Sequence, residues 1–301
     1  MASYTVTATV TSSPSKATGT GSAAFTVNAA TPAQCYFGIW DDADGYPGTS
    51  IAGTTKFSAA PVKSATYYLA HEAPWVGSGA QSFTQLCGAA GITPYLNLEP
   101  WDTWGGGANP SMTDIANGVY DSYYIAFAQG VKAQGVLVYM TFAHEMNGTW
   151  YPWGAQAISP ATWLAAWKHV HDVMNANAGG FIKWVWAPNN IDVGSCVPYW
   201  PGPSYADIAG FDGYLNAAGQ TYASFVKQTV TQIRTLTTTL PIWNAETGIE
   251  PNDSTRLARI TQFVSDMHAD GLYGFTWFNE GTFLLSTAET QALTSAVNTW
   301  N

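Results

Sequence analysis

The segment TFAHEMNGTWYPWG, at residues 141–154, crowds a histidine, a glutamate and an asparagine together with large aromatic side chains. Aromatic neighbours exclude water from a carboxyl group, and burial raises the pKa of that group because the charged form loses hydration. A carboxyl group that stays protonated near neutral pH can act as a general acid. Such chemistry also needs a second, ionised carboxylate close by, so Glu145 requires a partner.

Candidate partners lie at the ends of short apolar runs elsewhere in the chain. The acidic residues in such positions are Asp41, Asp42, Glu72, Glu99, Asp212, Glu246 and Glu280. Glu246 stands out because it belongs to the run PIWNAETG (241–248), in which little solvent can reach a side chain. We therefore take Glu145 and Glu246 as the candidate catalytic pair, one acid kept protonated and the other kept ionised.

Plainer interpretations compete with this pair. A glutamate at the end of a strand is commonly a helix cap or a surface charge. Glu72 is a rival, because YYLAHEAPW (67–75) also contains His-Glu beside a tryptophan. Asp212 in GFDGY can serve simply to hold its loop together. The stretch DDADG (41–45) resembles half of a calcium loop but lacks the terminal glutamate at the expected place.

The apolar runs indicate which elements position these acids. Eight runs follow one another at residues 35–40, 64–70, 92–101, 136–145, 182–190, 208–216, 241–248 and 273–280, and helical patterns separate them. Eight strands that alternate with helices over roughly 250 residues are typical of a (β/α)8 TIM barrel, an α/β fold. The C-terminal ends of the strands meet at one mouth of such a barrel, which would bring Glu145 and Glu246 together.

Three of the intervening helices have readable ends. The segment 159–179 opens with Ser-Pro, an N-cap followed by proline in the first turn, and closes with glycine. A second helix is predicted to open at Ser254 and to end before a glycine at position 271. The last helix begins with a capping box at 286–289 and ends near Trp300.

A doubly wound open sheet is the competing fold. It would use fewer strands, and it usually carries a glycine-rich phosphate-binding loop after its first strand. The glycines of CYFGIWDDADGYPG (35–48) do not have that spacing, and GxxxxGK[ST] occurs nowhere in the chain. The sequence therefore favours the barrel.

Residues 1–33 differ from the rest of the chain. The stretches YTVTATV (4–10) and AFTV (24–27) are β-like and flank a turn-like segment, which predicts a short β-hairpin or a sandwich fragment followed by a linker. The predicted barrel domain then spans residues 34–301. The start, MASYTVTATV, is no signal peptide, and no apolar run is as long as a transmembrane helix.

The composition combines few charges with many aromatic rings. Charged residues make up 10% of the 301 residues and the net charge is −10, which argues against nucleic acid or an anionic membrane as a partner. The 14 Trp, 16 Tyr and 13 Phe fit platforms for sugar rings, and a cofactor or drug-like pocket is the competing interpretation. Weakly charged surfaces are common in exported proteins, so we expect a secreted protein whose export signal lies outside this chain.

The cysteines give no metal motif. Cys35, Cys87 and Cys196 show neither CxxC nor the Cys/His spacing of a zinc site. One disulfide with a free thiol and three buried thiols both fit the sequence. We expect neither a metal nor another cofactor.

A long motif adds a family resemblance to these patterns. HEMNGTWYPWG (144–154) closely resembles the signature of glycoside hydrolase family 26, the β-mannanase family of clan A. Supporting matches are NLEPWD (97–102), WVWAPNN (184–190), GFDGYLN (210–216), NAETG (244–248) and GFTWFN (274–279). The resemblance covers about residues 35–301 and leaves out the N-terminal segment.

The resemblance implies a (β/α)8 barrel that hydrolyses a β-linked polysaccharide with retention. We expect endo action, although the sequence itself does not distinguish endo from exo action. The resemblance assigns the acid/base role to Glu145 and the nucleophile to Glu246. The substrate-binding residues that it implies are His144, Trp150, Tyr214, Trp277, Glu99, Trp101 and Asn189. Among these, Tyr214 matches a tyrosine that hydrogen-bonds the nucleophile, and Trp277 matches the platform beneath the distorted sugar.

Departures from the family pattern leave the substrate open. Thr141 and Phe278 stand where many relatives and some mannanases, respectively, have arginine. β-1,4-Mannan is the first candidate, and β-1,3-1,4-glucan, β-1,3-xylan and a bacterial surface glycan are alternatives on the same machinery. A non-catalytic carbohydrate-binding barrel and a purely structural barrel are the remaining alternatives. We expect a monomer that binds a polysaccharide or oligosaccharide.

Overall fold

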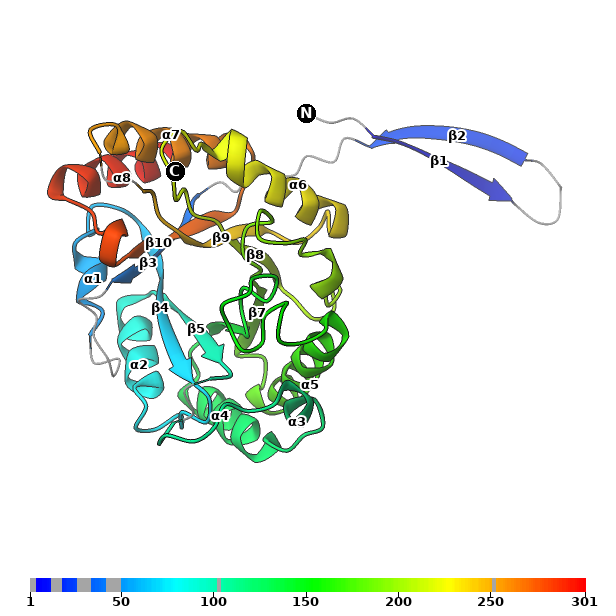
Figure 1. The fold of residues 1–301 in the computed structure, drawn as a ribbon. Helices are drawn as coiled ribbons and strands as arrows, with labels where there is room; N and C mark the ends of the chain where they lie inside the picture. Colours follow the sequence, from blue (N-terminus) through cyan, green and yellow to red (C-terminus); the bar gives the residue numbers. More distant parts are fainter. Residues whose placement is uncertain (1–3, 12–17, 26–33, 42–49, 102–103, 251–252) are drawn as a thin grey trace.

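Eight parallel strands close into a barrel in the computed structural model (Figure 1). The structure describes residues 4–11, 18–25, 34–41, 50–101, 104–250 and 253–301. The barrel strands are β3 (Tyr36–Asp41), β4 (Val62–Ala70), β5 (Thr93–Glu99), β6 (Val138–Phe142), β7 (Ile182–Trp186), β8 (Ile208–Asp212), β9 (Ile242–Thr247) and β10 (Gly274–Asn279). They pair in chain order, and β10 closes the ring against β3. Each predicted apolar run overlaps one strand, so the predicted (β/α)8 fold is confirmed.

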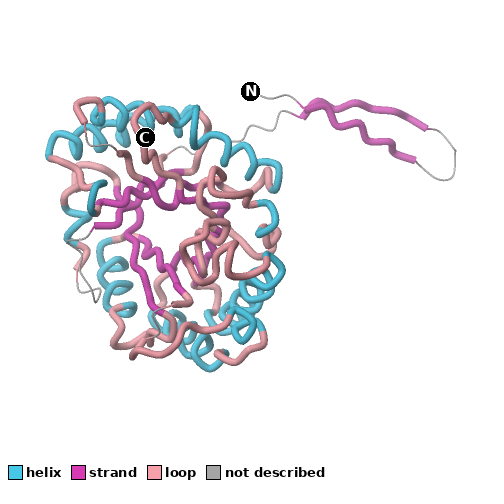
Figure 2. Tube along the Cα trace, in the orientation of Figure 1, coloured by secondary structure: helices cyan, strands magenta, loops and turns pink. Residues whose placement is uncertain are grey.

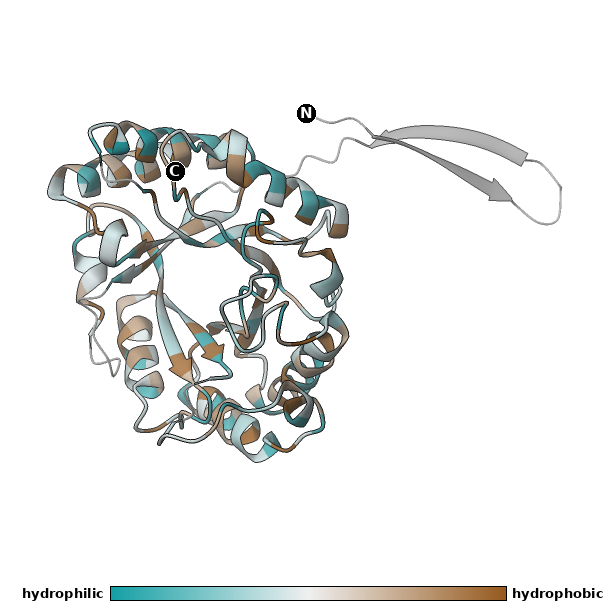
Figure 3. Cartoon of the chain, in the orientation of Figure 1, coloured by the Kyte–Doolittle hydropathy of each residue, from teal (hydrophilic) through white to brown (hydrophobic). Residues whose placement is uncertain are grey.

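The helices surround this ring of strands (Figure 2). They are α1 (Ala52–Thr55), α2 (Ala80–Ala90), α3 (Met112–Ala116), α4 (Asp121–Gln134), α5 (Pro160–Ala178), α6 (Lys227–Leu236), α7 (Arg256–Ala269) and α8 (Thr287–Trp300). The described residues also form the helical turns η2 (Val197–Tyr199), η3 (Tyr222–Val226) and η4 (Gly281–Phe283). Hydrophilic and hydrophobic residues alternate along the helices, as a helix with one face on a barrel and one in solvent requires (Figure 3).

Two of the three predicted helix starts are confirmed, and the third is wrong by one residue. The Ser159 side chain accepts a hydrogen bond from the Thr162 amide at the start of α5, and the capping box of α8 is formed. The N-cap of α7 is Thr255, not Ser254. The difference arises because the Asp253 carboxylate accepts from both the amide and the hydroxyl of Thr255, which holds the turn before the helix.

Apolar side chains pack in two separate layers, one inside the barrel and one around it. The inner cluster consists of Tyr95, Val185, Ala187, Ile208, Trp243 and Ala245. The larger outer cluster lies between strands and helices and contains buried indoles such as Trp163, Trp167 and Trp184. Many of the tryptophans therefore fill the core, and only part of the aromatic content can serve a binding surface.

The N-terminal segment contains two paired strands. β1 (Tyr4–Thr11) and β2 (Thr18–Phe25) are antiparallel, with Tyr4 opposite Phe25. The predicted linker falls largely within 26–33, outside the described residues, as does most of the DDADG stretch. The division of the chain at residue 33 stays a prediction.

All three cysteines are free and buried, so the alternative with three buried thiols is the correct one. No described helix combines the length and the apolar character needed to span a bilayer.

A buried histidine lies at the end of β4, beneath the N-terminal part of α4. The His71 side chain is 3% exposed, and its ring packs edge-on against Tyr120 at 4.6 Å between centroids. Neither ring nitrogen has a hydrogen-bond partner among the described residues. Burial lowers the pKa of His71 to about 4, because the charged imidazolium would lose its hydration here.

Acid should therefore destabilise the barrel through His71. The unfolded chain binds a proton near pH 6.5 and the folded chain only near pH 4, so the unfolded state gains protons first as the pH falls. The free energy of unfolding is therefore unaffected by His71 above pH 6.5 and falls between pH 6.5 and 4 as the unfolded state binds the proton. Over this range we expect the free energy of unfolding of His71→Phe to fall by roughly 1–3 kcal/mol less than that of wild type. The measurement is urea unfolding at several pH values. An unchanged pH dependence would contradict the assignment.

Candidate active site

Glu145 and Glu246 both lie buried at the C-terminal mouth of the barrel. Glu145 follows β6 and is 7% exposed, and Glu246 lies on β9 and is 6% exposed. They are close enough to interact, since the negative charge of Glu246 contributes to the raised pKa of Glu145. Parallel strands that end at one rim thus unite two acids that are about one hundred residues apart in the sequence.

A β-bulge in β9 turns Glu246 toward the barrel mouth. Ala245 belongs to the inner apolar cluster, so strict alternation would point Glu246 outward. However, β9 holds one extra residue against each neighbour: Asp212 of β8 is opposite Glu246 directly after Phe211 is opposite Asn244, and the register with β10 shifts at the same place. An extra residue re-aims the following side chain, which explains how two successive residues can face inward.

Backbone strain and indole hydrogen bonds shape the turn that carries Glu145. Ala143 and Glu145 have positive φ angles of 49° and 53°, a conformation that costs free energy for residues other than glycine. Trp163 donates its indole N–H to the Ala143 carbonyl at 3.1 Å, and Trp153 donates to the His144 carbonyl at 2.6 Å. These two buried tryptophans hold the strained turn in place, so their rings do more than exclude water.

Two donors fix the Glu145 carboxyl group itself. The Trp150 indole N–H donates to Oε2 at 2.7 Å, and the Asn189 amide donates to Oε1. Burial raises the pKa of Glu145 as the largest effect; His144 lowers it, and Glu246 raises it again. The hydrogen bonds from Asn189 and Trp150 also lower this pKa without cancelling the rise. Glu145 therefore holds a proton more tightly than a carboxyl group in water.

Two phenols hold the Glu246 carboxylate. Tyr214 donates to Oε2 at 3.0 Å, as the family resemblance implied, and Tyr68 donates to Oε1 at 2.6 Å. Tyr68 on β4 was missed by the sequence analysis, because SATYYLA reads only as an apolar strand. The alternation of a strand does predict that one of Tyr67 and Tyr68 points inward, but it offers no reason to connect that ring with β9.

His144 links the acids of the site to one another. Its Nε2 lies 3.3 Å from Glu99, and its Nδ1 lies 3.3 Å from Asp212 and 3.4 Å from Glu246. Burial alone would lower the pKa of His144, but Tyr151 and the hydrogen bonds to these carboxyl groups raise it well above its usual value. The imidazole is thus held as a cation that offsets part of the negative charge around it.

Asp212 belongs to this cluster in addition to holding its loop. Its backbone N–H donates to the Pro188 carbonyl and its own carbonyl accepts from Asn190, as expected for a loop anchor. Its side chain is completely buried, however, and contacts His144. Burial, followed by the charge of Glu246, raises the pKa of Asp212 well above its ordinary value.

The same groups offer the geometry of a small cation site. Ligand atoms of His144, Asp212 and Glu246 lie within 4.8 Å of one another. The raised pKa of His144 favours the protonated ring, which donates hydrogen bonds and cannot bind a metal. We therefore interpret the cluster as a hydrogen-bond network, and the absence of a metal stays a prediction.

The two tryptophans predicted to stack on sugar occupy different positions. Trp101 is partly buried at the mouth, with its ring edge-on to Tyr151 at 5.1 Å between centroids. Trp277 is fully buried and donates its indole N–H to the Phe283 carbonyl. A fully buried ring offers no face to a sugar, which corrects the prediction for Trp277. Its neighbour Phe278 faces the site instead, 6.4 Å from the Tyr68 ring and 6.3 Å from the Tyr214 ring.

The rival acids lie outside the cluster. The Glu72 side chain is 44% exposed, and its carboxylate lies 3.8 Å from His71. Asp41 is buried, but it pairs with Lys56 at 2.7 Å and accepts from Asn279 at 2.6 Å. Asp42 falls outside the described residues. These placements remove Glu72 and Asp41 from the candidates, while Asp212 and Glu99 remain beside Glu145 and Glu246 as contacts of His144.

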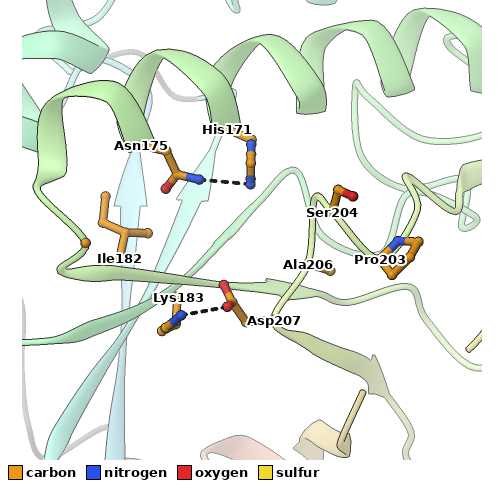
Figure 4. Close-up of a pocket in the computed structure, with 9 residues that line it drawn as sticks. His171, Asn175, Ile182, Lys183, Pro203, Ser204, Ala206 and Asp207 are labelled. Atoms are coloured by element: carbon orange, nitrogen blue, oxygen red, sulfur yellow. Dashed lines mark hydrogen bonds and ion pairs between the residues drawn. The ribbon is translucent and has the colours of Figure 1, made fainter. Parts of the chain in front are cut away.

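Two cavities lie at opposite ends of the barrel. One of about 250 Å³ adjoins the acids, and Trp150, Asn189 and Tyr214 line it together with Asn190 and Asn216. The other, of about 340 Å³, lies where β7 begins, at the opposite end (Figure 4). In the second cavity Lys183 pairs with Asp207 and His171 pairs with Asn175. Asp207 is the one carboxyl group among the described residues that line it. The first cavity is the one placed to receive a substrate.

Comparison with known sequences points to one family of glycoside hydrolases. Residues 117–255 match the profile of glycosyl hydrolase family 26. Endoglucanase H of Acetivibrio thermocellus is 34% identical over 136 residues, which are 43% of this chain and 14% of that protein. A mannan endo-1,4-β-mannosidase of Bacillus subtilis strain 168 is 30% identical over 118 residues, which are 36% of this chain and 30% of that protein. The chain thus spans under a third of the length of either relative.

Solved structures agree on the fold. The catalytic domain of an endo-β-1,4-mannanase from Bacillus sp. JAMB-750 has a TM-score of 0.64 at 17% identity, and the match covers 89% of this chain and 85% of that one. A modular endo-β-1,4-mannanase from Cellulomonas fimi has a TM-score of 0.68 at 15% identity, and the match covers 87% and 70%. At such low identity these matches support the barrel fold alone.

Removing the indole donor from Glu145 should raise the pKa of this carboxyl group further. In Trp150→Phe the hydrogen bond to Oε2 is lost, and that bond lowers the pKa because it stabilises the ionised form. The measurement is a carboxyl 13C NMR titration of labelled glutamate, with the Glu145 signal assigned through Glu145→Gln. Trp104→Phe is the matched control, since Trp104 and Trp150 are 46% and 47% exposed. Equal titration midpoints in wild type and Trp150→Phe would contradict the prediction.

Proposed function

The chain belongs to glycosyl hydrolase family 26, and from this premise we propose that it hydrolyses a β-linked polysaccharide with retention of configuration. Glu246 is the proposed nucleophile and Glu145 the proposed acid/base. The observation that carries this proposal is the contrast between the two carboxyl environments. Glu246 accepts hydrogen bonds from two phenols and contacts a cationic imidazole, whereas burial raises the pKa of Glu145.

In the first step, one oxygen of Glu246 attacks the anomeric carbon of the sugar. The bond between that carbon and the glycosidic oxygen breaks, and Glu145 gives its proton to the departing oxygen. The sugar is then held as an ester on Glu246. This step requires an ionised Glu246 and a protonated Glu145, which is the state that the two environments favour.

In the second step, Glu145 acts as a base. It takes a proton from a water molecule as the water oxygen attacks the anomeric carbon from the side that the leaving group vacated. The ester bond breaks, Glu246 regains its negative charge, and the product has the original configuration. A retaining enzyme needs about 5–5.5 Å between the two carboxyl groups, whereas an inverting enzyme needs about 6.5–9.5 Å.

The cavity beside Glu145 supports a position for the leaving sugar. Trp150 and Asn189, which donate to Glu145, also line this cavity, as does Tyr214, which donates to Glu246. Trp150 is 47% exposed, so its ring can stack on a sugar while its N–H remains on the acid. On the other side, the Phe278 and Trp40 rings lie nearly parallel, with 6.1 Å between centroids.

We propose β-1,4-mannan as the first substrate to test. The Bacillus subtilis relative is named a mannan endo-1,4-β-mannosidase, and two structural neighbours are endo-β-1,4-mannanases. Endo action is proposed on the same ground. A polymer cannot enter a cell unaided, so secretion is part of the proposal, and the monomeric state stays a prediction.

A β-glucan is the second candidate, and particular observations favour it. The relative with 34% identity is named an endoglucanase. Phe278 and Thr141 also leave the site without arginine at two positions where the family comparison led us to expect one, and Thr141 is fully buried. An apolar ring and a buried hydroxyl favour a sugar bound by stacking over one held by charged hydrogen bonds. β-1,3-Xylan, bacterial surface glycans and binding without turnover remain further alternatives.

Replacing each proposed catalytic acid should give a different kinetic result. Glu246→Ala should lower turnover of polymer by at least about 10⁴-fold, because no covalent intermediate can form. Glu145→Ala should lower polymer turnover by roughly 10²–10⁴-fold but spare the first step on a dinitrophenyl glycoside, whose leaving group needs little protonation. Added azide should then restore the second step. Glu72→Ala is the control, since Glu72 lies outside the cluster.

The substrate is tested with a panel of polysaccharides. We expect the wild-type protein to release reducing sugar from β-1,4-mannan, and 1H NMR of the first product to show the retained β-anomer. Release from β-1,3-1,4-glucan with none from mannan would assign the second candidate. Normal polymer turnover by Glu145→Ala, or an inverted anomer, would overturn the assigned mechanism. Binding of every glycan without cleavage would replace hydrolysis with a binding function.

A further inference from the structure

Tyr68 reaches across the barrel to the carboxylate that the proposed mechanism uses as nucleophile. Its hydroxyl donates to Oε1 of Glu246 at 2.6 Å, while Tyr214 donates to Oε2 at 3.0 Å. Tyr214 comes from the loop after β8, which neighbours β9, whereas Tyr68 comes from β4, three places round the ring. Each oxygen of Glu246 therefore has its own phenol, and the donor from the distant strand makes the shorter contact.

We propose that Tyr68 is a positioning residue that orients Glu246 and stabilises its ionised form, most of all when the ester intermediate breaks. This inference rests on the proposed function. A hydrogen bond to a charged oxygen is shorter and stronger than one to a neutral oxygen. When the glycosyl ester forms, the charge of Glu246 is lost and the bond weakens. When water releases the sugar, the charge returns and the bond regains its strength.

Tyr68 is held where this role requires it. Its ring lies edge-on to Trp40, with 5.1 Å between centroids, and edge-on to Phe278 at 6.4 Å. The Trp40 indole is itself fixed by a 2.9 Å hydrogen bond to Glu280. A phenol packed between two rings loses little entropy when it donates, so its direction is set before substrate binds.

Tyr68 also remains a donor throughout the working pH range. Burial, followed by the negative charge of Glu246, raises the pKa of Tyr68 well above its ordinary value. The phenol therefore keeps its proton and does not compete with Glu145 as an acid.

The adjacent tyrosine provides a matched control. Tyr67 lies on the same strand and points to the opposite face, where its hydroxyl donates to the Ser78 carbonyl at 2.9 Å. Changing either residue to phenylalanine removes one hydroxyl and, with it, the hydrogen bond named above. Only Tyr68→Phe removes a donor from Glu246, so a difference between the two variants isolates that contact.

The test compares wild type, Tyr68→Phe and Tyr67→Phe on the polymer that wild type cleaves best and on a dinitrophenyl glycoside. We expect kcat/KM of Tyr68→Phe to fall roughly 10–100-fold, as for loss of a hydrogen bond to a charged group. The acid limb of its pH profile should move to higher pH, because the ionised carboxylate has lost a donor. Its covalent intermediate, measured by mass spectrometry after acid quenching, should accumulate because the carboxylate leaves more slowly. Tyr67→Phe should match wild type in all three measurements.

A second readout does not depend on turnover. In carboxyl 13C NMR spectra recorded at one fixed pH, the chemical shift of the Glu246 signal should differ from wild type in Tyr68→Phe and stay in place in Tyr67→Phe. Replacing Tyr68 by 3-fluorotyrosine keeps the ring shape and makes the hydroxyl a stronger donor, so it should move the signal in the opposite direction. Equal behaviour of Tyr68→Phe and Tyr67→Phe would overturn the role of Tyr68. A wild-type protein that cleaves nothing would instead overturn the proposed function, while the comparison of NMR signals still decides this inference.

Discussion

The site depends on a single electrostatic constraint, the burial of several acids in one small volume. Glu99, Asp212, Glu246 and Glu145 all surround His144 at the mouth of the barrel, and each buried negative charge raises the cost of the next. His144 offsets part of this cost because its raised pKa keeps it cationic between three of them. Asp212 relieves more of it, since a carboxyl group with a strongly raised pKa can stay neutral. The cluster is therefore stable when some of its carboxyl groups are protonated and others are ionised. Acid–base chemistry needs both kinds of group side by side.

The fold meets this constraint with devices that are local and identifiable. Parallel strands deliver every acid to one rim, and a bulge in β9 turns Glu246 inward next to Ala245. Positive φ angles at Ala143 and Glu145 bend the chain after β6 across the mouth, and the N–H groups of Trp153 and Trp163 hold that bend. The aromatic residues near Glu145 thus work as hydrogen-bond donors as much as apolar surface. This explains why so many of them cluster around a carboxyl group in a chain with few charges.

The same devices mark where prediction from sequence succeeds and where it ends. Strand order and the rim position of Glu145 and Glu246 follow from patterns that any parallel barrel must show, so those predictions rest on periodicity alone.

Which side chain faces inward is less predictable, because a bulge changes the alternation without changing the composition of the strand. The platform assigned to Trp277 came from the family resemblance, and it failed although β10 is regular against β3: the ring at the mouth belongs to Phe278, one residue later. The contact of Tyr68 with Glu246 spans 178 residues and three strand positions, and no local pattern encodes it. The N-cap of α7 moved by one residue because an aspartate side chain competes for the same turn.

In the proposed mechanism, the coupling between the two acids supplies a reason for the change of role of Glu145 within one reaction cycle. Burial raises the pKa of Glu145, and the charge of Glu246 raises it further, so the free site favours a proton on Glu145. Formation of the ester removes the charge of Glu246, and with it that part of the rise. The opposing effects of the cationic His144, the Asn189 amide and the Trp150 indole remain and now act against burial alone. The pKa of Glu145 therefore falls once the ester has formed, so its carboxylate is ionised and free to accept a proton from water at the moment when the second step needs a base. No movement of the backbone is required, because the bond made to Glu246 itself changes the field at Glu145.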